Sequence, residues 1–295
     1  MDAVRSMLFI PGNNEEWILD APKKYDADGY IYCLEDGTPP SQKEEARNIV
    51  SDCLDKLEDT DDVISVRVND PKSEHFHKDL EKIVKPGLDV IAVPKIDTPE
   101  TVKHVESVLT HVEKMRGLDG EIDMVLLPET PMATHKPFDV LSASDRVSGV
   151  LGAATDGGDY NRAVGYDWSK DGWESVPIRS RFVSAARAAG VSEIMSGMWT
   201  DIEDIEGLRH TLTQAKNLGF TGYWVVHPSH IEHVNEIFSP SEDDIQEELE
   251  IVEKLEEAYE EGRGAVPYKG NMIDEADRRT AKKRLSRARD LGLID

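Results

Sequence analysis

The sequence contains very little cysteine: its 295 residues include only Cys33 and Cys53. Two such thiols form neither a disulfide framework nor the paired spacing of a zinc site. No stretch approaches the roughly 18 apolar residues of a membrane-spanning helix. The first residues, MDAVRSMLFIPG, lack the basic start and the small-residue cleavage site of a signal peptide. We therefore expect a cytoplasmic protein that has no membrane partner.

Basic residues are scarce relative to acids. The chain has 34 Lys plus Arg against 59 Asp plus Glu, which gives a formal net charge of −25. Such a surface repels nucleic acid and anionic membranes. Acids are dispersed through the segments of helical period as well as concentrated in residues 239–262. This distribution favours adaptation to high salt, where counterions screen self-repulsion, over one acidic interaction tail. We expect a halophilic source.

Short apolar runs rich in β-branched residues recur along the chain. They cover residues 6–12, 29–36, 63–69, 88–95, 123–129, 147–154, 192–198 and 222–228. Most are continuous rather than alternating, as is typical of strands buried on both faces of a parallel sheet. Segments of helical period, such as 41–57, 98–115 and 178–190, lie between them.

This repeated alternation of strand and helix predicts a (β/α)₈ TIM barrel. An open, doubly wound sheet has similar content, but the chain lacks a glycine-rich phosphate turn after its first strand. We expect residues 1–238 to form the barrel. Residues 239–295 would form a C-terminal helical extension or lid that contacts a neighbouring subunit.

Charged residues gather where the predicted strands end. They are Glu35, Asp36, Arg67, Lys95, Glu129, Asp156 and Asp159, with Asn69 and His227 beside them. In barrels of this kind the chemistry lies at the carboxyl ends of the strands. A Glu and an Asp on neighbouring strand ends, completed by water and substrate oxygens, are a usual way to hold Mg²⁺. An arginine inside a barrel is costly unless it meets an anion. The pattern indicates a site for a metal and an anionic substrate.

Several of these residues have other interpretations. Glu129 could be a salt-bridge partner on the rim, and Asp156 or Asp159 could serve only the chemistry of a glycine-bearing turn. Lys95 could instead form a Schiff base. His227 precedes a proline at the start of a helical segment, so it could be a metal ligand or a capping residue.

Seven motifs occur in register over nearly the whole chain. They are RSMLFIPGN, LEDGTPPSQKEEAR, VRVN, VPKID, LLPET, VVHPSHIEHVNEIFSP and GAVPYKGNMIDEADRRTAKKRLSRA. Together they closely resemble the citrate lyase β-subunit-like CoA-ester lyases of the HpcH/HpaI aldolase superfamily. Malyl-CoA, β-methylmalyl-CoA and citramalyl-CoA lyases belong to this group. The resemblance implies a (β/α)₈ barrel with C-terminal helices that assembles as a homo-trimer or homo-hexamer.

The resemblance also implies an activity. It is the reversible, Mg²⁺-dependent cleavage of a carbon–carbon bond in a 3-hydroxyacyl-CoA thioester, with Mn²⁺ as a substitute metal. Malyl-CoA or β-methylmalyl-CoA would give glyoxylate plus acetyl-CoA or propionyl-CoA. The alternatives are a citrate lyase β subunit, a citramalyl-CoA lyase and a malyl-CoA thioesterase. A metal-dependent aldolase of free keto acids and a catalytically silent barrel are less compatible with these charged residues.

The resemblance assigns residues to the CoA thioester and its acyl group. Arg5, Ser6, Lys43 and Arg47 would hold the CoA phosphates. Lys95 is expected to contact the anionic substrate from its own place at a strand end. Lys43 and Arg47 are one helical turn apart, after the two prolines that follow Glu35 and Asp36.

The resemblance further assigns residues to the metal and to catalysis. Glu129 would be a direct metal ligand, and Glu35 and Asp36 would bind waters on the metal. Arg67 would polarise the thioester or its enolate. Asp274 would reach the active site of a neighbouring subunit as the acid/base group.

The second metal ligand has two candidates, because this chain departs from the family's usual G-x-x-D turn. Counting from Glu129 without a gap selects Asp156, whereas the following Tyr160 and the distance to Gly165 select Asp159. We favour Asp159 because its surroundings match on both counts, with Asp156 in reserve.

Overall fold

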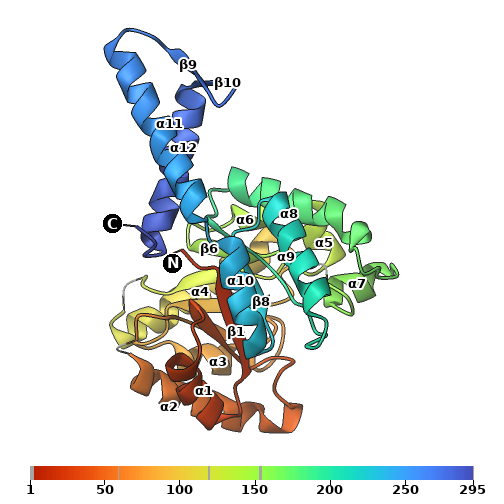
Figure 1. The fold of residues 1–295 in the computed structure, drawn as a ribbon. Helices are drawn as coiled ribbons and strands as arrows, with labels where there is room; N and C mark the ends of the chain where they lie inside the picture. Colours follow the sequence, from red (N-terminus) through yellow and green to blue (C-terminus); the bar gives the residue numbers. More distant parts are fainter. Residues whose placement is uncertain (1–2, 59, 119, 153–154, 295) are drawn as a thin grey trace. The chain divides into compact units, whose positions relative to one another are not determined.

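Eight parallel strands close into a barrel in the computed structural model, which describes residues 3–58, 60–118, 120–152 and 155–294 (Figure 1). The strands are β1 (Ser6–Pro11), β2 (Gly29–Cys33), β3 (Val63–Arg67), β4 (Val90–Val93), β5 (Asp123–Leu126), β6 (Val147–Leu151), β7 (Glu193–Ser196) and β8 (Gly222–Val225). They follow one another around the barrel in chain order, and β8 pairs with β1. The predicted (β/α)₈ barrel is confirmed.

Helices connect these strands and surround the barrel (Figure 1). They are α1 (Glu15–Lys24), α2 (Lys43–Leu57), α3 (Phe76–Ile83), α4 (Pro99–Arg116), α5 (Pro131–His135), α6 (Pro137–Leu141), α7 (Asp159–Val164), α8 (Val176–Ala188), α9 (Ile205–Leu218) and α10 (Ile231–Phe238), with 3₁₀ turns η1 (Pro40–Gln42), η2 (Trp173–Ser175) and η3 (Pro228–His230). Helix α4 shows why they begin and end where they do. The Thr98 side chain accepts a hydrogen bond from the Thr101 N–H, and Gly117 ends the helix with a left-handed backbone.

Two apolar cores explain the continuous hydrophobic runs of the strands. Successive side chains of a strand point to opposite faces, so each strand supplies both cores. Ile31, Val125 and Trp224 pack inside the barrel. Tyr32 and Val66 instead pack between the barrel and its helices. Because side chains fill the interior, a ligand must bind at an end of the barrel.

The strands end earlier than the apolar runs suggest. Strand β2 stops at Cys33 instead of continuing to residue 36, because the Thr38 hydroxyl donates to the Cys33 carbonyl at 2.6 Å and the Thr38 N–H donates to the Glu35 carbonyl at 2.9 Å. The tight turn leaves Glu35 in the loop at the mouth. The sixth predicted run ends in residues 153–154, which lie outside the described residues.

The chain divides into two compact units, Ala3–Phe238 and a second that begins at Ser239. The second contains α11 (Glu242–Glu260), β9 (Ala265–Tyr268), β10 (Asn271–Asp274) and α12 (Glu275–Asp290). Strands β9 and β10 form an antiparallel pair, and a small core around Leu255, Val266 and Ile273 holds the unit together. Among the described helices of both units, none combines the length and apolar composition that crossing a bilayer requires.

Candidate active site

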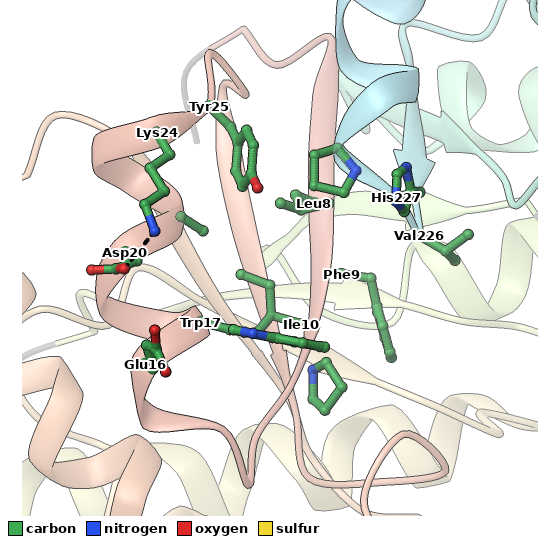
Figure 2. Close-up of a pocket in the computed structure, with 13 residues that line it drawn as sticks. Leu8, Phe9, Ile10, Glu16, Trp17, Asp20, Lys24, Tyr25, Val226 and His227 are labelled. Carbon is green, nitrogen blue, oxygen red and sulfur yellow. Dashed lines mark hydrogen bonds and ion pairs between the residues drawn. The ribbon is translucent and has the colours of Figure 1, made fainter. Parts of the chain in front are cut away.

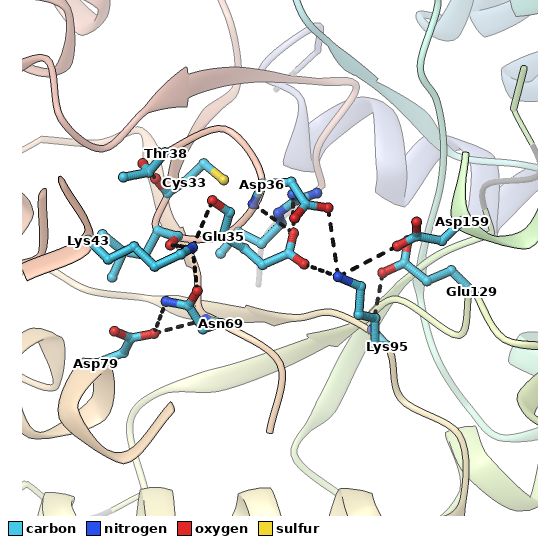
Figure 3. Close-up of polar contacts among 12 residues, drawn as sticks. Cys33, Glu35, Asp36, Thr38, Lys43, Asn69, Asp79, Lys95, Glu129 and Asp159 are labelled. Carbon is cyan, nitrogen blue, oxygen red and sulfur yellow. Dashed lines mark hydrogen bonds and ion pairs between the residues drawn. The ribbon is translucent and has the colours of Figure 1, made fainter. Parts of the chain in front are cut away.

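Glu35 lies at the centre of a charged cluster at the mouth of the barrel (Figure 3). It is 4% exposed and forms ion pairs with Arg67 through one carboxylate oxygen and with Lys95 through the other. The Asp36 N–H also donates to Glu35 at 3.0 Å. Burial alone would raise the pKa of Glu35, but the charge of Arg67, the hydrogen bond from Lys95 and the Asp36 N–H together lower it. Glu35 is therefore held as a carboxylate.

Arg67, the last residue of β3, is the buried cation of this cluster. It is 7% exposed, and its guanidinium carbon lies 5.1 Å from the centre of the Phe9 ring. Burial disfavours its charge, but Cys33, Glu35 and the other nearby acids keep the pKa of Arg67 raised. Within the described part of the chain, its buried Nε finds no hydrogen-bond partner. This N–H is available to a ligand oxygen.

Glu129 and Asp159 lie beside Lys95 on the other side of the cluster (Figure 3). Glu129 accepts a hydrogen bond from the Lys95 backbone N–H at 3.1 Å. Burial raises the pKa of Glu129 to about 7; Arg67 opposes this shift and Asp159 adds to it. Asp159, at the start of α7, also pairs with Arg162 on the same helix. The structure thus brings Glu129 and Asp159 together.

Asp156 has a different environment. It is exposed in the turn before α7, whereas Asp159 is half-buried and lies within ion-pair distance of Lys95. This placement favours Asp159 as the partner of Glu129.

The acid cluster suits a hard cation. Among the residues that the structure describes, no three His, Cys, Asp or Glu side chains are close enough to hold a metal by themselves. However, the Lys95 ammonium already lies among Glu35, Asp36 and Asp159, so the cluster stabilises positive charge. Mg²⁺ commonly takes one or two carboxylates and completes its shell with water and substrate oxygens. The residues present fit that pattern.

Lys43 has internal partners at the mouth. Its ammonium donates to the Leu34 carbonyl at 2.9 Å, the Glu35 carbonyl at 3.1 Å and Asn69 Oδ1 at 2.6 Å (Figure 3). These contacts fix the end of β2 against the loop after β3. Lys43 therefore positions Glu35, a role that the sequence did not reveal.

Arg47 is likewise engaged inside the fold. It is 5% exposed and pairs at 2.8 Å with Asp79 of α3, which also accepts hydrogen bonds from the backbone and side-chain amides of Asn69. Arg47 and Lys43 also line an open groove of about 640 Å³, together with Lys78 and Lys82. Contact of Lys43 and Arg47 with CoA phosphates stays a prediction, and the structure gives both residues a positioning role.

Arg5 and Ser6 lie at the other end of the barrel. Ser6 begins β1, so both residues are at the amino ends of the strands. Arg5 pairs with Asp28 at 2.6 Å, and the buried Ser6 hydroxyl donates to Asn235 at 2.7 Å. The barrel core therefore separates Arg5 and Ser6 from the charged cluster at the mouth, and their contact with CoA phosphates stays a prediction.

His227 follows β8 and has a local role. Its Nδ1 accepts a hydrogen bond from the Ser229 N–H at 3.3 Å and lies 2.8 Å from the Ser229 hydroxyl. It therefore caps the turn η3, as the capping interpretation predicted.

A cavity of about 520 Å³ lies beside β1 (Figure 2). It is lined by residues of β1, of α1 and of the segment after β8, including Phe9, Trp17 and Tyr25. Phe9 is common to the cavity and the cluster: it is among the lining residues, and its ring lies against Arg67. Trp17 is 57% exposed. The sequence analysis missed this cavity; the signal present was the aromatic Trp17, at the start of the helix that follows the first strand.

Comparisons with known proteins agree with this geometry. A family model described as HpcH/HpaI aldolase/citrate lyase matches residues 5–228. The citrate lyase subunit beta of Leuconostoc mesenteroides subsp. cremoris is 31% identical over 271 residues, covering 92% of this chain and 88% of that protein. The L-malyl-CoA/beta-methylmalyl-CoA lyase of Rhodobacter capsulatus is 27% identical over 297 residues, covering 94% of this chain and 92% of that protein.

A solved structure shows the same likeness. Protein CitE from Mycobacterium tuberculosis, in complex with magnesium, acetoacetate and coenzyme A, superposes with a TM-score of 0.74 at 26% identity. The match covers 97% of this chain and 98% of that one.

The raised pKa of Glu129 predicts a pH-dependent stability in the absence of metal. The carboxyl group of Glu129 binds its proton more tightly in the folded protein than in the unfolded chain. The protonated group therefore stabilises the fold fully at a pH below its pKa in the unfolded chain, and this contribution is lost as the pH rises through about 7. In EDTA, the urea midpoint of the wild type should therefore fall more between about pH 5 and about pH 8 than that of Glu129→Gln. The exposed Asp156→Asn should follow the wild type. Parallel profiles for the wild type and Glu129→Gln would contradict this account.

Proposed function

This chain belongs to the HpcH/HpaI aldolase/citrate lyase family, and from that premise we propose that it is a Mg²⁺-dependent CoA-ester lyase. It would cleave a 3-hydroxyacyl-CoA such as malyl-CoA or β-methylmalyl-CoA, reversibly, to glyoxylate plus acetyl-CoA or propionyl-CoA. The observation that carries the proposal is the buried Arg67 with an unpaired N–H beside Glu35 and Glu129, at the mouth of a barrel. The carboxylates of this cluster can bind a metal, and the Arg67 cation can stabilise an oxyanion.

The metal would be held by Glu129 and Asp159, with Glu35 and Asp36 toward its waters and Asp156 as the reserve ligand. When bound, Mg²⁺ supplies Lewis-acid polarisation of the carbonyl that forms during cleavage. The related CitE structure contains magnesium, acetoacetate and coenzyme A, and this supports a Mg²⁺-dependent reaction.

Cleavage places negative charge on the thioester oxygen and transfers one proton from the substrate hydroxyl to the enolate carbon. A carboxylate takes the proton of the hydroxyl group, which becomes the carbonyl of the keto acid, while the electrons of the broken carbon–carbon bond form a thioester enolate. Arg67 stabilises the negative charge on the enolate oxygen. This electrostatic stabilisation is large because the cation is already oriented and the site contains little water. A carboxyl group then protonates the enolate carbon. No covalent nucleophile is needed, so a Schiff base at Lys95 is not part of the mechanism.

The cavity of Figure 2 would receive the arm that carries the acyl group. Its aromatic lining residues Phe9 and Trp17 suit an uncharged chain, and the Phe9 ring lies beside Arg67. The CoA phosphates would lie outside it, where Lys43, Arg47 and their open groove supply positive charge.

The proton donor would be Asp274 from a neighbouring copy in a homo-trimer or homo-hexamer. Within its own unit, Asp274 accepts a hydrogen bond from the Ala276 N–H at 2.8 Å and forms a capping box with Asp277 at the start of α12. Its side chain is exposed, so it is accessible to another subunit.

Three further activities fit the same residues. A citrate lyase β subunit or a citramalyl-CoA lyase would perform the same cleavage on another acyl group, and the β subunit would use an acyl carrier protein. A malyl-CoA thioesterase would instead release malate and CoA. The relatives include both a citrate lyase subunit beta and a malyl-CoA lyase, and this supports cleavage over thioester hydrolysis.

A substrate panel tests this function. We expect malyl-CoA or β-methylmalyl-CoA, compared with citramalyl-CoA and citryl-CoA, to give glyoxylate and the shorter acyl-CoA in mass spectrometry of the products. EDTA and Asp159→Ala should abolish the reaction because both remove the metal, whereas Asp156→Ala should retain it. Release of malate with free CoA would identify a thioesterase. Full activity in EDTA would disprove the role of the metal.

Arg67 should be required for turnover. Loss of one group that stabilises an oxyanion costs about 10²–10³ in kcat, so Arg67→Ala should lose at least this much while circular dichroism shows a retained fold. Arg67→Lys should not restore activity, because a point charge lacks the planar fork of a guanidinium. Arg209→Ala, which removes an exposed arginine of α9, is the matched control. An Arg67→Ala enzyme that keeps more than about a tenth of the wild-type kcat would remove Arg67 from the mechanism.

Subunit mixing tests the role of Asp274. Asp274→Ala and Glu129→Ala should each be inactive alone. Hybrid oligomers should regain part of the activity, since some mouths then combine an intact Glu129 with a neighbour's intact Asp274. No recovery after demonstrated subunit exchange would show that Asp274 acts within its own chain or only caps α12.

A further inference from the structure

The ammonium of Lys95 lies where three acidic side chains converge (Figure 3). It is ion-paired with Glu35 and lies 3.7 Å from Asp36 and 3.8 Å from Asp159. These acids come from the loop after β2 and from the start of α7. One side chain therefore connects the two halves of the proposed metal site.

The backbone of Lys95 is also unusual. Its φ is +53°, a left-handed conformation that residues other than glycine seldom adopt. In this conformation its N–H donates to Glu129 at 3.1 Å while its side chain extends to Glu35. Lys95 thus contacts both a predicted metal ligand and the carboxylate that orients Arg67.

The cluster needs positive charge. Four acids, Glu35, Asp36, Glu129 and Asp159, face Arg67 and Lys95, and Arg162 pairs with Asp159 as a third cation, so the acids still outnumber the cations. Arg67 is 7% exposed, and its ion pair is with Glu35. Lys95 has a side chain that is 31% exposed, so it can leave the cluster for solvent at lower cost.

We propose that Lys95 is a displaceable counter-ion: it stabilises the acidic mouth without metal and weakens Mg²⁺ binding by competing for Asp159. This inference rests on the proposed metal site. The Lys95 ammonium lies within ion-pair distance of Asp159, a predicted metal ligand. It therefore repels an incoming Mg²⁺ until the lysine side chain moves away. Metal binding and movement of the Lys95 side chain are thereby coupled.

Calorimetric titration with Mg²⁺ at one pH near 8 tests the competition. Lys95→Met keeps the backbone N–H and removes the charge. Its Kd for Mg²⁺ should therefore be about tenfold lower than that of the wild type, which corresponds to about 1.4 kcal/mol of binding free energy. Lys95→Arg should stay near the wild type because it keeps the charge. Lys72→Met controls for charge loss, since Lys72 is an exposed lysine whose partner, Asp97, belongs to the same loop as Lys95; its Kd should not change.

The controls separate this inference from the proposed function. If the wild type binds no Mg²⁺, or if Glu129→Gln binds it as well as the wild type, the proposed metal site fails. If the wild type binds, Glu129→Gln does not, and Lys95→Met binds equally or more weakly, the metal site stands and the counter-ion role is overturned.

Thermal unfolding provides a second measurement. In EDTA, Lys95→Met should have a lower Tm than the wild type because the acids lose their counter-ion. Saturating Mg²⁺ should raise the Tm of Lys95→Met more than that of the wild type, since binding to the folded state alone stabilises it. If Lys95→Met is unfolded in EDTA, folding on addition of Mg²⁺ supports the proposal. Equal Tm gains, or no recovery, overturn it.

Discussion

The ion pair between Arg67 and Glu35 is the interaction on which the mouth of the barrel depends. Both groups are almost fully buried, and each would be very unfavourable there without the other. The pair fixes the end of β3 against the turn after β2. It also leaves one N–H of Arg67 free to meet a ligand. The remaining charged residues of the site hold this pair in position or balance its surroundings.

The fold was predictable because its signals are local and repeated. Each buried strand is a short apolar run, and residues such as Glu35 and Glu129 follow such runs in the chain. The rule that parallel strands end at one edge brings them together. The choice of Asp159 over Asp156 depended on the neighbours of each residue, and the structure places Asp159 in the cluster.

The directions of long side chains were not predictable. Lys43 and Arg47 occur at a spacing that suits a phosphate, but their acceptors, Asn69 and Asp79, come from other elements. Arg5 belongs to a family motif but does not lie at the mouth. The motif alone could not predict this, because it does not show at which end of the strand the residue lies. The position of the Lys95 ammonium depends on a left-handed backbone that no sequence pattern indicated.

Phe9 belongs to two features of the structure: it is one of the residues that line the cavity, and its ring lies 5.1 Å from the guanidinium carbon of Arg67. If Arg67 is the catalytic cation proposed above, a substrate arm in the cavity would restrict a residue that lies directly beside it. Binding energy from a part of the substrate far from the reacting bond can in this way be used at that bond. Discrimination then takes place in the chemical step: a truncated hydroxy acid without a carrier arm could occupy the mouth and still turn over slowly, and this would be measured as a lower kcat rather than only a higher KM.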